Sequence, residues 1–248
     1  GTVALNNPAN AFDGSVGVSG SGATVVDSTP LTLGNTDLGS GGLAATSKGD
    51  ITQAPGSTIA SDGTTALTVN GSGGINLSGA NDFGGTVNAA SVALDSNGQP
   101  QVVNGQPVTQ PISGSVAIAD TGALTLGPIN TTGNLVATAG GTGDLTLGTN
   151  TVGGNVTATA GGGLDLGTTT AGGNVAATAG GAVDLGQLTT TGDLAATSTG
   201  GSITQSGPLN VGGNTTASAD PTTGTVALNN PANAFDGSVG VSGSGATV

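Results

Sequence analysis

Aspartate must carry any acid–base or metal chemistry that this chain performs. The 248 residues include no His and no Cys, all fourteen acidic residues are Asp, and Lys48 is the one basic side chain. Nucleophilic triads and ordinary zinc sites need His, Cys or Glu, so both are excluded. The remaining chemistry is that of carboxylate pairs, either as acid and base or as ligands for a hard cation.

The strongest candidate pair is Asp165 and Asp184. They hold the same place in two similar strings, Gly-Leu-Asp-Leu-Gly and Ala-Val-Asp-Leu-Gly, that begin 19 residues apart. If the strings stack, the carboxyl groups lie about 5 Å apart, as in a retaining glycosidase. However, the neighbourhood offers no cation to hold an acidic sugar and no Trp or Tyr to stack on one. We therefore expect no enzyme and no cofactor, and the open alternatives are a weak Ca²⁺ site or a solvated acidic face.

The chain repeats itself on two scales. Residues 1–25 recur without change at 224–248, which defines a super-repeat over 1–223 and the start of the next one. Within it, two short strings recur together at intervals of 19–21 residues, one like Asp-Leu-Thr-Leu-Gly and one like Gly-Asn-Val-Thr-Ala-Thr-Ala-Gly-Gly. Neither end carries a distinct capping repeat, so we expect the chain to be a window of a longer array.

These strings have the pattern of short half-buried strands. Apolar and polar residues alternate over four to six positions, and glycines follow each string where a tight corner needs them. With three Phe as the only aromatic residues, the core must be thin and built from Leu, Val, Ile and Ala. The sequence therefore predicts an all-β protein, a parallel β-helix that runs continuously over 1–248. At one strand spacing per coil, a 223-residue unit would make about eleven coils and rise ~53 Å.

Stacked coils would place equivalent polar residues in a column. Asn134, Asn155 and Asn174, continued by Asp193, hold equivalent positions, and we expect them to form a structural ladder along the axis.

One segment breaks the period. Residues 95–115 contain three of the ten prolines and the string Asn-Gly-Gln-Pro twice. Asn104-Gly105 is a strong hairpin-turn dipeptide, so we expect a loop or small hairpin that protrudes from the solenoid. Its polar residues Gln99, Gln101, Asn104 and Gln106 are candidate contacts for a ligand, because insertions in solenoids often carry function.

Charge excludes several partners. With a net charge of −13 and a single basic side chain, the chain has no basic patch that could bind nucleic acid or an anionic membrane. No apolar run approaches the ~18 residues of a membrane span, so we expect no membrane insertion.

The string Ala-Asn-x-Phe-x-Gly-Ser/Thr-Val occurs at 9–16, 80–87 and 232–239 and contains every Phe of the chain. Together with Leu-Thr-Leu-Gly, Gly-Gly-Asn-Val-Thr-Ala-Thr-Ala-Gly-Gly and Gly-Asp-Ile-Thr-Gln, it resembles the repeats of filamentous haemagglutinin-type adhesins, which include biofilm-matrix adhesins of Gram-negative two-partner secretion systems. The resemblance covers most of the chain except 95–115. It implies a right-handed parallel β-helix, export through an outer-membrane transporter partner, and an extracellular fibre at the bacterial surface or in the biofilm matrix.

The function expected from these features is that of a stalk in a long adhesin or matrix fibre, which mediates attachment or cell–cell cohesion. One alternative is a glycan-binding module that recognises matrix exopolysaccharide through 95–115 or the outward Thr and Asn columns. Another is a filament or surface layer that assembles from neighbouring fibres through open coil edges.

Overall fold

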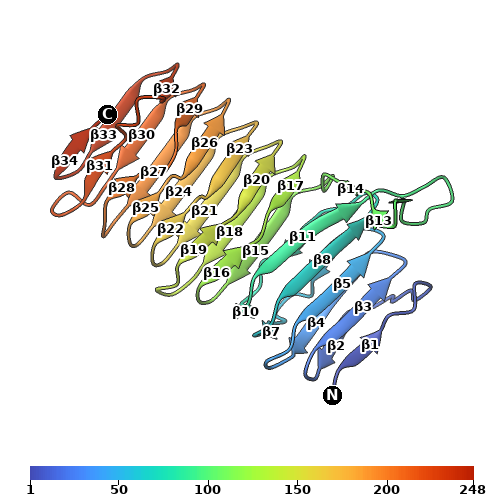
Figure 1. Ribbon diagram of the computed structural model, residues 1–248. Helices are drawn as coiled ribbons and strands as arrows, with labels where there is room; N and C mark the ends of the chain where they lie inside the picture. Colours follow the sequence, from blue (N-terminus) through green and yellow to red (C-terminus); the bar gives the residue numbers. More distant parts are fainter. The chain divides into compact units, whose positions relative to one another are not determined.

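The computed structural model describes residues 1–248 and is all-β (Figure 1). Parallel strands stack as a β-solenoid of about 12 coils, which confirms the predicted fold class. No helix is long and apolar enough to cross a membrane. The chain divides into two compact units, the first formed by 1–121 with 129–133 and the second by 122–128 with 134–248.

The first unit consists mainly of two parallel sheets. In one, neighbouring strands come from successive coils: β1 (Val3–Leu5), β3 (Ala23–Asp27), β5 (Leu43–Ser47), β8 (Thr65–Asn70) and β11 (Val87–Val92). The other contains β2 (Val16–Ser19), β4 (Leu31–Asp37), β6 (Ile51–Gln53), β7 (Ile59–Ser61), β9 (Ile75–Leu77), β10 (Asp82–Phe83) and β15 (Val116–Asp120). The long strand β4 pairs with β6 through its first half and with β7 through its second. A short strand, β17 (Ile129–Thr131), completes this unit.

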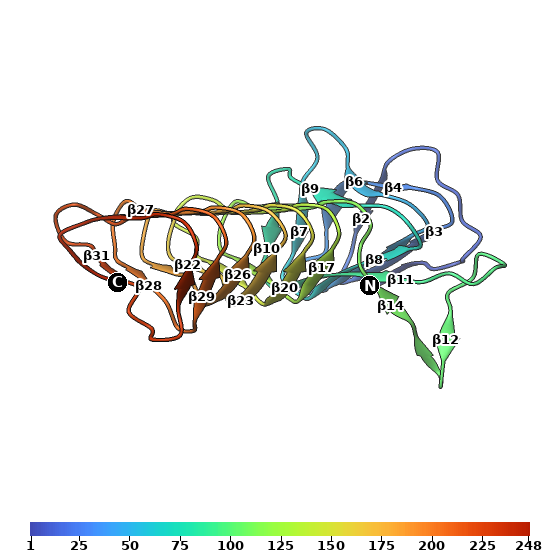
Figure 2. The ribbon, with the colours of Figure 1, turned by 90° about the horizontal axis from the view of Figure 1, so that it is seen from above.

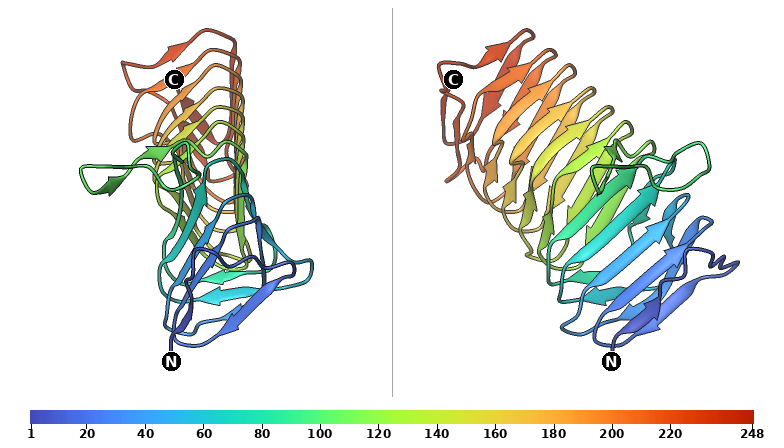
Figure 3. Two further views of the ribbon diagram at one scale, coloured as in Figure 1. Left: turned by 90° about the vertical axis from the view of Figure 1, so that its right-hand side faces the viewer. Right: turned by 45° about the vertical axis from the view of Figure 1, so that its right-hand side comes forward.

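The second unit is more regular, and most of its coils have three strands. The first sheet contains β16 (Leu124–Leu126), β19 (Leu145–Leu147), β22 (Leu164–Asp165), β25 (Val183–Asp184), β28 (Ile203–Thr204), β31 (Thr225–Ala227) and β34 (Gly245–Thr247). The second contains β18 (Leu135–Ala139), β21 (Val156–Ala160), β24 (Val175–Ala179), β27 (Leu194–Ser198), β30 (Thr215–Ser218) and β33 (Val239–Ser242). The third contains β20 (Thr149–Val152), β23 (Thr168–Ala171), β26 (Gln187–Thr190), β29 (Leu209–Val211) and β32 (Ala234–Phe235). Figure 3 shows these strands following one another coil by coil.

The core of the second unit is a set of stacked columns. Leu135 pairs with Val156, Val156 with Val175, and Val175 with Leu194, all almost fully buried. Two residues further on, a second buried column consists only of alanine: Ala137, Ala158, Ala177 and Ala196. In-register parallel pairing places like residues over like, so one sequence pattern repeated at the coil period is enough to fill the core.

The third strand of each coil has no alternating apolar pattern in the sequence. Its inward residues are polar at about half of the positions, as with Asn150, Thr169 and Thr190. Hydrogen bonds make this burial acceptable: Asn150 Nδ2 donates to Thr169 Oγ1 at 3.3 Å, and Thr169 Oγ1 donates to the Leu166 carbonyl at 2.8 Å. Strands with polar inward residues escape a search for hydrophobic periodicity.

A hairpin projects from the first unit after β11 (Figure 2). The strands β12 (Val102–Val103) and β13 (Gln106–Pro107) pair antiparallel, and β14 (Thr109–Gln110) then returns antiparallel to β11. The chain rejoins the core at Ile112, which is fully buried. The insertion thus ends before the expected boundary at 115, because the last residues of that range belong to the next coil.

Candidate functional site

Asp165 and Asp184 lie side by side on adjacent strands. They are register partners on β22 and β25, with Asp165 exposed and Asp184 half-buried. Each carboxylate accepts a hydrogen bond from a glycine of its own coil, Asp165 Oδ1 from Gly167 N and Asp184 Oδ1 from Gly186 N, both at 2.8 Å. Each therefore closes the turn that follows its strand.

The glycines of these turns have no substitute. Gly167 and Gly186 have φ of 56° and 60°, in the left-handed region. A Cβ at Gly186 would also overlap the carbonyl oxygen of Gly167 in the coil below. The Asp-Leu-Gly string thus contains everything that this turn needs. Its glycine adopts the positive φ, and its carboxylate accepts the hydrogen bond of the glycine amide.

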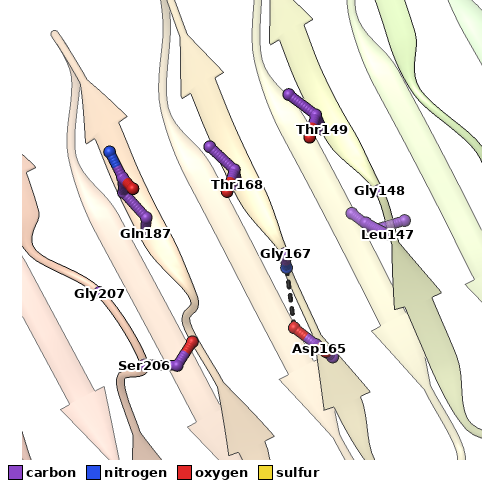
Figure 4. A pocket seen from close by; sticks show the side chains of 9 residues that line it. All are labelled: Leu147, Gly148, Thr149, Asp165, Gly167, Thr168, Gln187, Ser206 and Gly207. Atoms are coloured by element: carbon purple, nitrogen blue, oxygen red, sulfur yellow. Dashed lines mark hydrogen bonds between the residues drawn. The ribbon is translucent and has the colours of Figure 1, made fainter.

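An open groove of about 400 Å³ runs beside this corner. Figure 4 shows its lining residues, with the Asp165–Gly167 hydrogen bond drawn as a dashed line. The lining is Leu147, Gly148, Thr149, Asp165, Gly167, Thr168, Gln187, Ser206 and Gly207. It presents hydroxyls, one amide and one carboxylate, so it can form hydrogen bonds but holds no acid–base pair.

The structure brings together no group of three or more His, Cys, Asp or Glu side chains that could hold a metal ion. A Ca²⁺ ion takes six to eight oxygen ligands. Asp165 and Asp184 would supply two carboxylates, each with one oxygen already engaged by a turn amide. A cation bound here would have to take most of its ligands from water.

The column of Asn134, Asn155, Asn174 and Asp193 forms a chain of hydrogen bonds along the coils. Each side-chain oxygen accepts a hydrogen bond from the backbone N–H of its counterpart one coil on. Asn155 N donates to Asn134 Oδ1 at 2.8 Å, Asn174 N to Asn155 Oδ1 at 2.8 Å, and Asp193 N to Asn174 Oδ1 at 2.9 Å. Asn214 N and Ser238 N extend the series at 2.7 Å and 3.1 Å. The acceptors bind backbone amides rather than neighbouring side-chain amides, which explains how Asp193 fits among asparagines.

The four polar residues of the hairpin are all exposed. Asn104 and Gly105 have φ of 53° and 77° and form the two-residue turn between β12 and β13. Asn104 therefore has a structural role, whereas Gln99, Gln101 and Gln106 present free amides. Next to them, Val102 and Val103 are each 56% exposed, so the hairpin also presents apolar surface.

The base of the hairpin forms one wall of a concavity of about 230 Å³ in the first unit. Its lining contains the only lysine of the chain and two amides: Pro8, Ala9, Val26, Asp27, Lys48, Asn70, Gln99 and Pro100. Gln99 is thus the one predicted contact residue that lines a hollow rather than the projecting tip.

Sequence reasoning missed a pair of amides that links the Gly-Asp/Ser-Ile-Thr-Gln and Ala-Asn-x-Phe strings. Gln53 and Asn81 are joined by two side-chain hydrogen bonds, and Gln205 and Asn233 repeat the arrangement. Both pairs are separated by 28 residues. That shared spacing was the available signal, but it exceeds one coil and is hidden when each string is considered alone.

Much of the chain matches one known family of repeats. Three stretches, 20–90, 153–184 and 172–242, match the family described as Repeats of unknown function (DUF5649), and together they cover more than half of the chain. The chain belongs to this family. Its DUF5649 stretches fall in both units, from β3 into β11 in the first and from residue 153 through β33 in the second. The DUF5649 repeat is therefore a run of solenoid coils.

No curated protein and no solved structure matches the chain.

Proposed function

We propose that this DUF5649 chain is a structural repeat region, the stalk of a long extracellular bacterial adhesin or biofilm-matrix fibre. The observation that carries the proposal is the use of the polar side chains. The Asn column and the Asp-Leu-Gly corners bond to the protein's own backbone, coil after coil, and form no cluster of catalytic groups. Such an arrangement stiffens a rod. We accordingly propose a mechanical rather than an enzymatic role.

The location follows from the resemblance to filamentous haemagglutinin-type repeats described above. We propose export through an outer-membrane transporter and residence at the cell surface or in the biofilm matrix. In that setting, neighbouring fibres or exopolysaccharide would be the partners, and attachment or cohesion would depend on the length of the fibre.

Electron microscopy of arrays with one, two and three 223-residue units tests the stalk. Unbranched rods that lengthen by ~53 Å per unit are expected from the strand spacing. Pulling on single arrays should release the chain in steps of one or a few coils, since each coil contacts only its neighbours. Compact particles, or a length that does not grow with the number of units, would overturn the proposal.

Glycan recognition by the hairpin is the second candidate. It is favoured by the exposed amides of Gln99, Gln101 and Gln106 on a segment that projects from the coils. In a co-sedimentation assay with matrix polysaccharide, replacing these three residues by Ala should abolish binding. Asn104 is left in place to keep the turn, and Gln187→Ala is the matched control on an exposed site elsewhere. Equal binding by all variants would exclude the hairpin as the binding site, and no binding by the unsubstituted chain would leave the passive stalk.

A further inference from the structure

The dipeptide Asn-Gly occurs three times in the chain, at 70–71, 97–98 and 104–105, and all three copies lie in the first unit. In this dipeptide an asparagine can lose its amide without an enzyme. The backbone nitrogen of the glycine attacks the side-chain Cγ of the asparagine, ammonia leaves, and water opens the cyclic imide to aspartate or isoaspartate. Glycine permits the attack because it has no side chain to shield its nitrogen. The dipeptide by itself does not distinguish the three copies.

The reaction has two structural requirements. The glycine nitrogen must be free to approach Cγ, because reacting atoms have to come into contact in the correct orientation. A glycine N–H that donates to a carbonyl is held in place, and that hydrogen bond must break first. The segment must also open locally, which is easiest in exposed parts with few buried contacts.

The copy at 70–71 meets neither requirement. Asn70 is half-buried at the end of β8, where it pairs with Val92 of β11. Gly71 N donates to the Val92 carbonyl at 2.9 Å. The side chain of Leu94 also packs against this glycine, since a Cβ at Gly71 would lie 2.9 Å from Leu94 Cδ1. Reaction at Asn70 would therefore require the sheet to open.

The copy at 97–98 is accessible but its turn is held closed. Asn97 is exposed, and Gly98 N donates to the Asp95 carbonyl at 3.0 Å. Asp95 Oδ1 accepts hydrogen bonds from Asn97 N and Gln99 N at 2.8 Å and 2.9 Å, and Asp95 N donates to the Gln99 carbonyl at 2.8 Å. Four hydrogen bonds thus fix this turn, and one of them engages the glycine nitrogen.

The copy at 104–105 meets both requirements. Asn104 is exposed, and neither its side chain nor Gly105 N takes part in a hydrogen bond. A Cβ at Gly105 would meet no atom within 4 Å. This turn joins β12 to β13, two strands of two residues each that project from the coils (Figure 2). A two-stranded ribbon of this size is marginally stable in water and opens readily.

We propose that Asn104 is a modification site, at which the folded chain undergoes spontaneous deamidation. Gly105 N gives its proton to a base in solution and forms a bond to Asn104 Cγ. The bond from Cγ to Nδ2 breaks, and Nδ2 leaves as ammonia after taking up a proton from solution. One water molecule then opens the imide. The inference concerns the hairpin alone and does not depend on the proposed role as a stalk.

The modification changes both the charge and the shape of the hairpin. Either product adds a negative charge to a segment, 96–119, that carries none. Isoaspartate also lengthens the backbone of the two-residue turn by a methylene group, and the turn geometry that pairs Val103 with Gln106 is then lost. Aspartate keeps that pairing, because it tolerates the left-handed conformation as asparagine does. The candidate contact residues Gln101 and Gln106 are therefore displaced as the chain ages.

Peptide mapping by mass spectrometry compares the three sites within one molecule. The folded chain is incubated at mildly alkaline pH and then digested with pepsin, whose acidic buffer stops the reaction. Conversion at Asn104 should be about tenfold faster than at Asn97, a factor that one or two hydrogen bonds account for. Asn70 should react last. Faster conversion at Asn97 or Asn70 than at Asn104 would overturn the proposal.

Unfolded protein is the control for the effect of the fold. In urea the three sites should react at similar rates, because the hydrogen bonds that separate them are gone. The same ranking in urea as in the folded chain would show that the structure does not select Asn104, and would overturn the proposal.

Asp95→Ala is the matched variant. It removes the acceptor of the Asn97 and Gln99 amides, so conversion at Asn97 should accelerate about tenfold while the rate at Asn104 stays the same. An unchanged rate at Asn97 would contradict the control by these hydrogen bonds. Hydrogen exchange at the Gln106 amide adds a readout of the turn: it should become faster in the isoaspartate product and stay slow in Asn104→Asp. Equal exchange in the two would show that the modification leaves the hairpin intact and would overturn its proposed effect.

Discussion

Gln53 and Asn81 lie 28 residues apart in the chain and exchange two side-chain hydrogen bonds. Gln53 Nε2 donates to Asn81 Oδ1 at 2.7 Å, and Asn81 Nδ2 donates to Gln53 Oε1 at 3.1 Å. The same glutamine also donates to the Ser57 carbonyl at 2.8 Å and accepts the Gly79 amide at 3.0 Å. Asn81 is fully buried, and the pair ties the end of β6 to the segment between β9 and β10.

Replacing Gln53 by Ala should destabilise the first unit by about 2–3 kcal/mol, because it removes both hydrogen bonds to the buried Asn81 together with those to the Ser57 carbonyl and the Gly79 amide. Urea unfolding followed by far-ultraviolet circular dichroism measures the loss. The control is Gln101→Ala on the exposed hairpin, which should change stability by no more than about 0.5 kcal/mol. Equal midpoints for the two variants would contradict a structural role for the pair.

The asparagine column predicts a local effect. Asn155→Ala removes the acceptor of the Asn174 amide, and water can replace it at this exposed turn, so a loss of about 0.5–1 kcal/mol is expected. Hydrogen exchange at the Asn174 amide should become faster. Asn155→Asp should preserve the protection, as Asp193 accepts the Asn214 amide in the same column. Faster exchange with Asp as well would show that the amide group itself is required.

The alanine column should not accept larger side chains. Ala177 is 1% exposed between Ala158 and Ala196, so Ala177→Leu is expected to destabilise the second unit by about 1–3 kcal/mol through overpacking. The neighbouring Ala176 is half-buried on the opposite face of β24, and Ala176→Leu should be tolerated. Thermal unfolding of both variants checks the prediction, and a similar melting temperature for the two would show that the alanine column has room for a larger side chain.

Substitutions of Asp184 distinguish a role in closing the turn from a role in binding a cation. Asp184→Ala should cost about 1 kcal/mol because Gly186 N loses its acceptor, whereas Asp184→Asn keeps an oxygen in place and should be nearly neutral. Calorimetric titration of the natural chain with Ca²⁺ provides the second measurement. Heat of binding that disappears in Asp184→Asn would assign a Ca²⁺ site to Asp165 and Asp184.

The hairpin base should respond to acid. Hydrogen bonds from the backbone amides of Gln99 and Asn97 hold the pKa of the exposed Asp95 carboxyl below its ordinary value of 3.8. A pKa that is lower in the folded state adds stability at pH values above the ordinary value, and this is lost as pH falls through the folded pKa. Nuclear magnetic resonance titration should show the Asn97 and Gln99 amide resonances moving only at strongly acidic pH, and not moving in Asp95→Asn. A midpoint at or above the ordinary value would contradict these hydrogen bonds.

The strings at the 19–21-residue period were sufficient to predict a parallel β-helix. In such a fold the inward residues of one coil contact the equivalent residues of the next, as Val156 contacts Val175, so sequence periodicity and spatial contact coincide. The number of strands per coil stayed open in the sequence, because the third strand lacks such a pattern. Its buried Asn150, Thr169 and Thr190 depend on hydrogen bonds that a hydrophobic pattern does not reveal.

The sequence by itself determined that the chain coils, which residues face the core, and that no histidine, cysteine or glutamate chemistry is available. Each of these depends on residue type and on local alternation. Only the tertiary structure decided which atoms the polar side chains bind. The Asp165 and Asp184 carboxylates close glycine turns, and the Gln53–Asn81 contact spans more than one coil. The physical reason is that a hydrogen bond depends on where two atoms meet in space, and a local pattern of residue types does not specify that place.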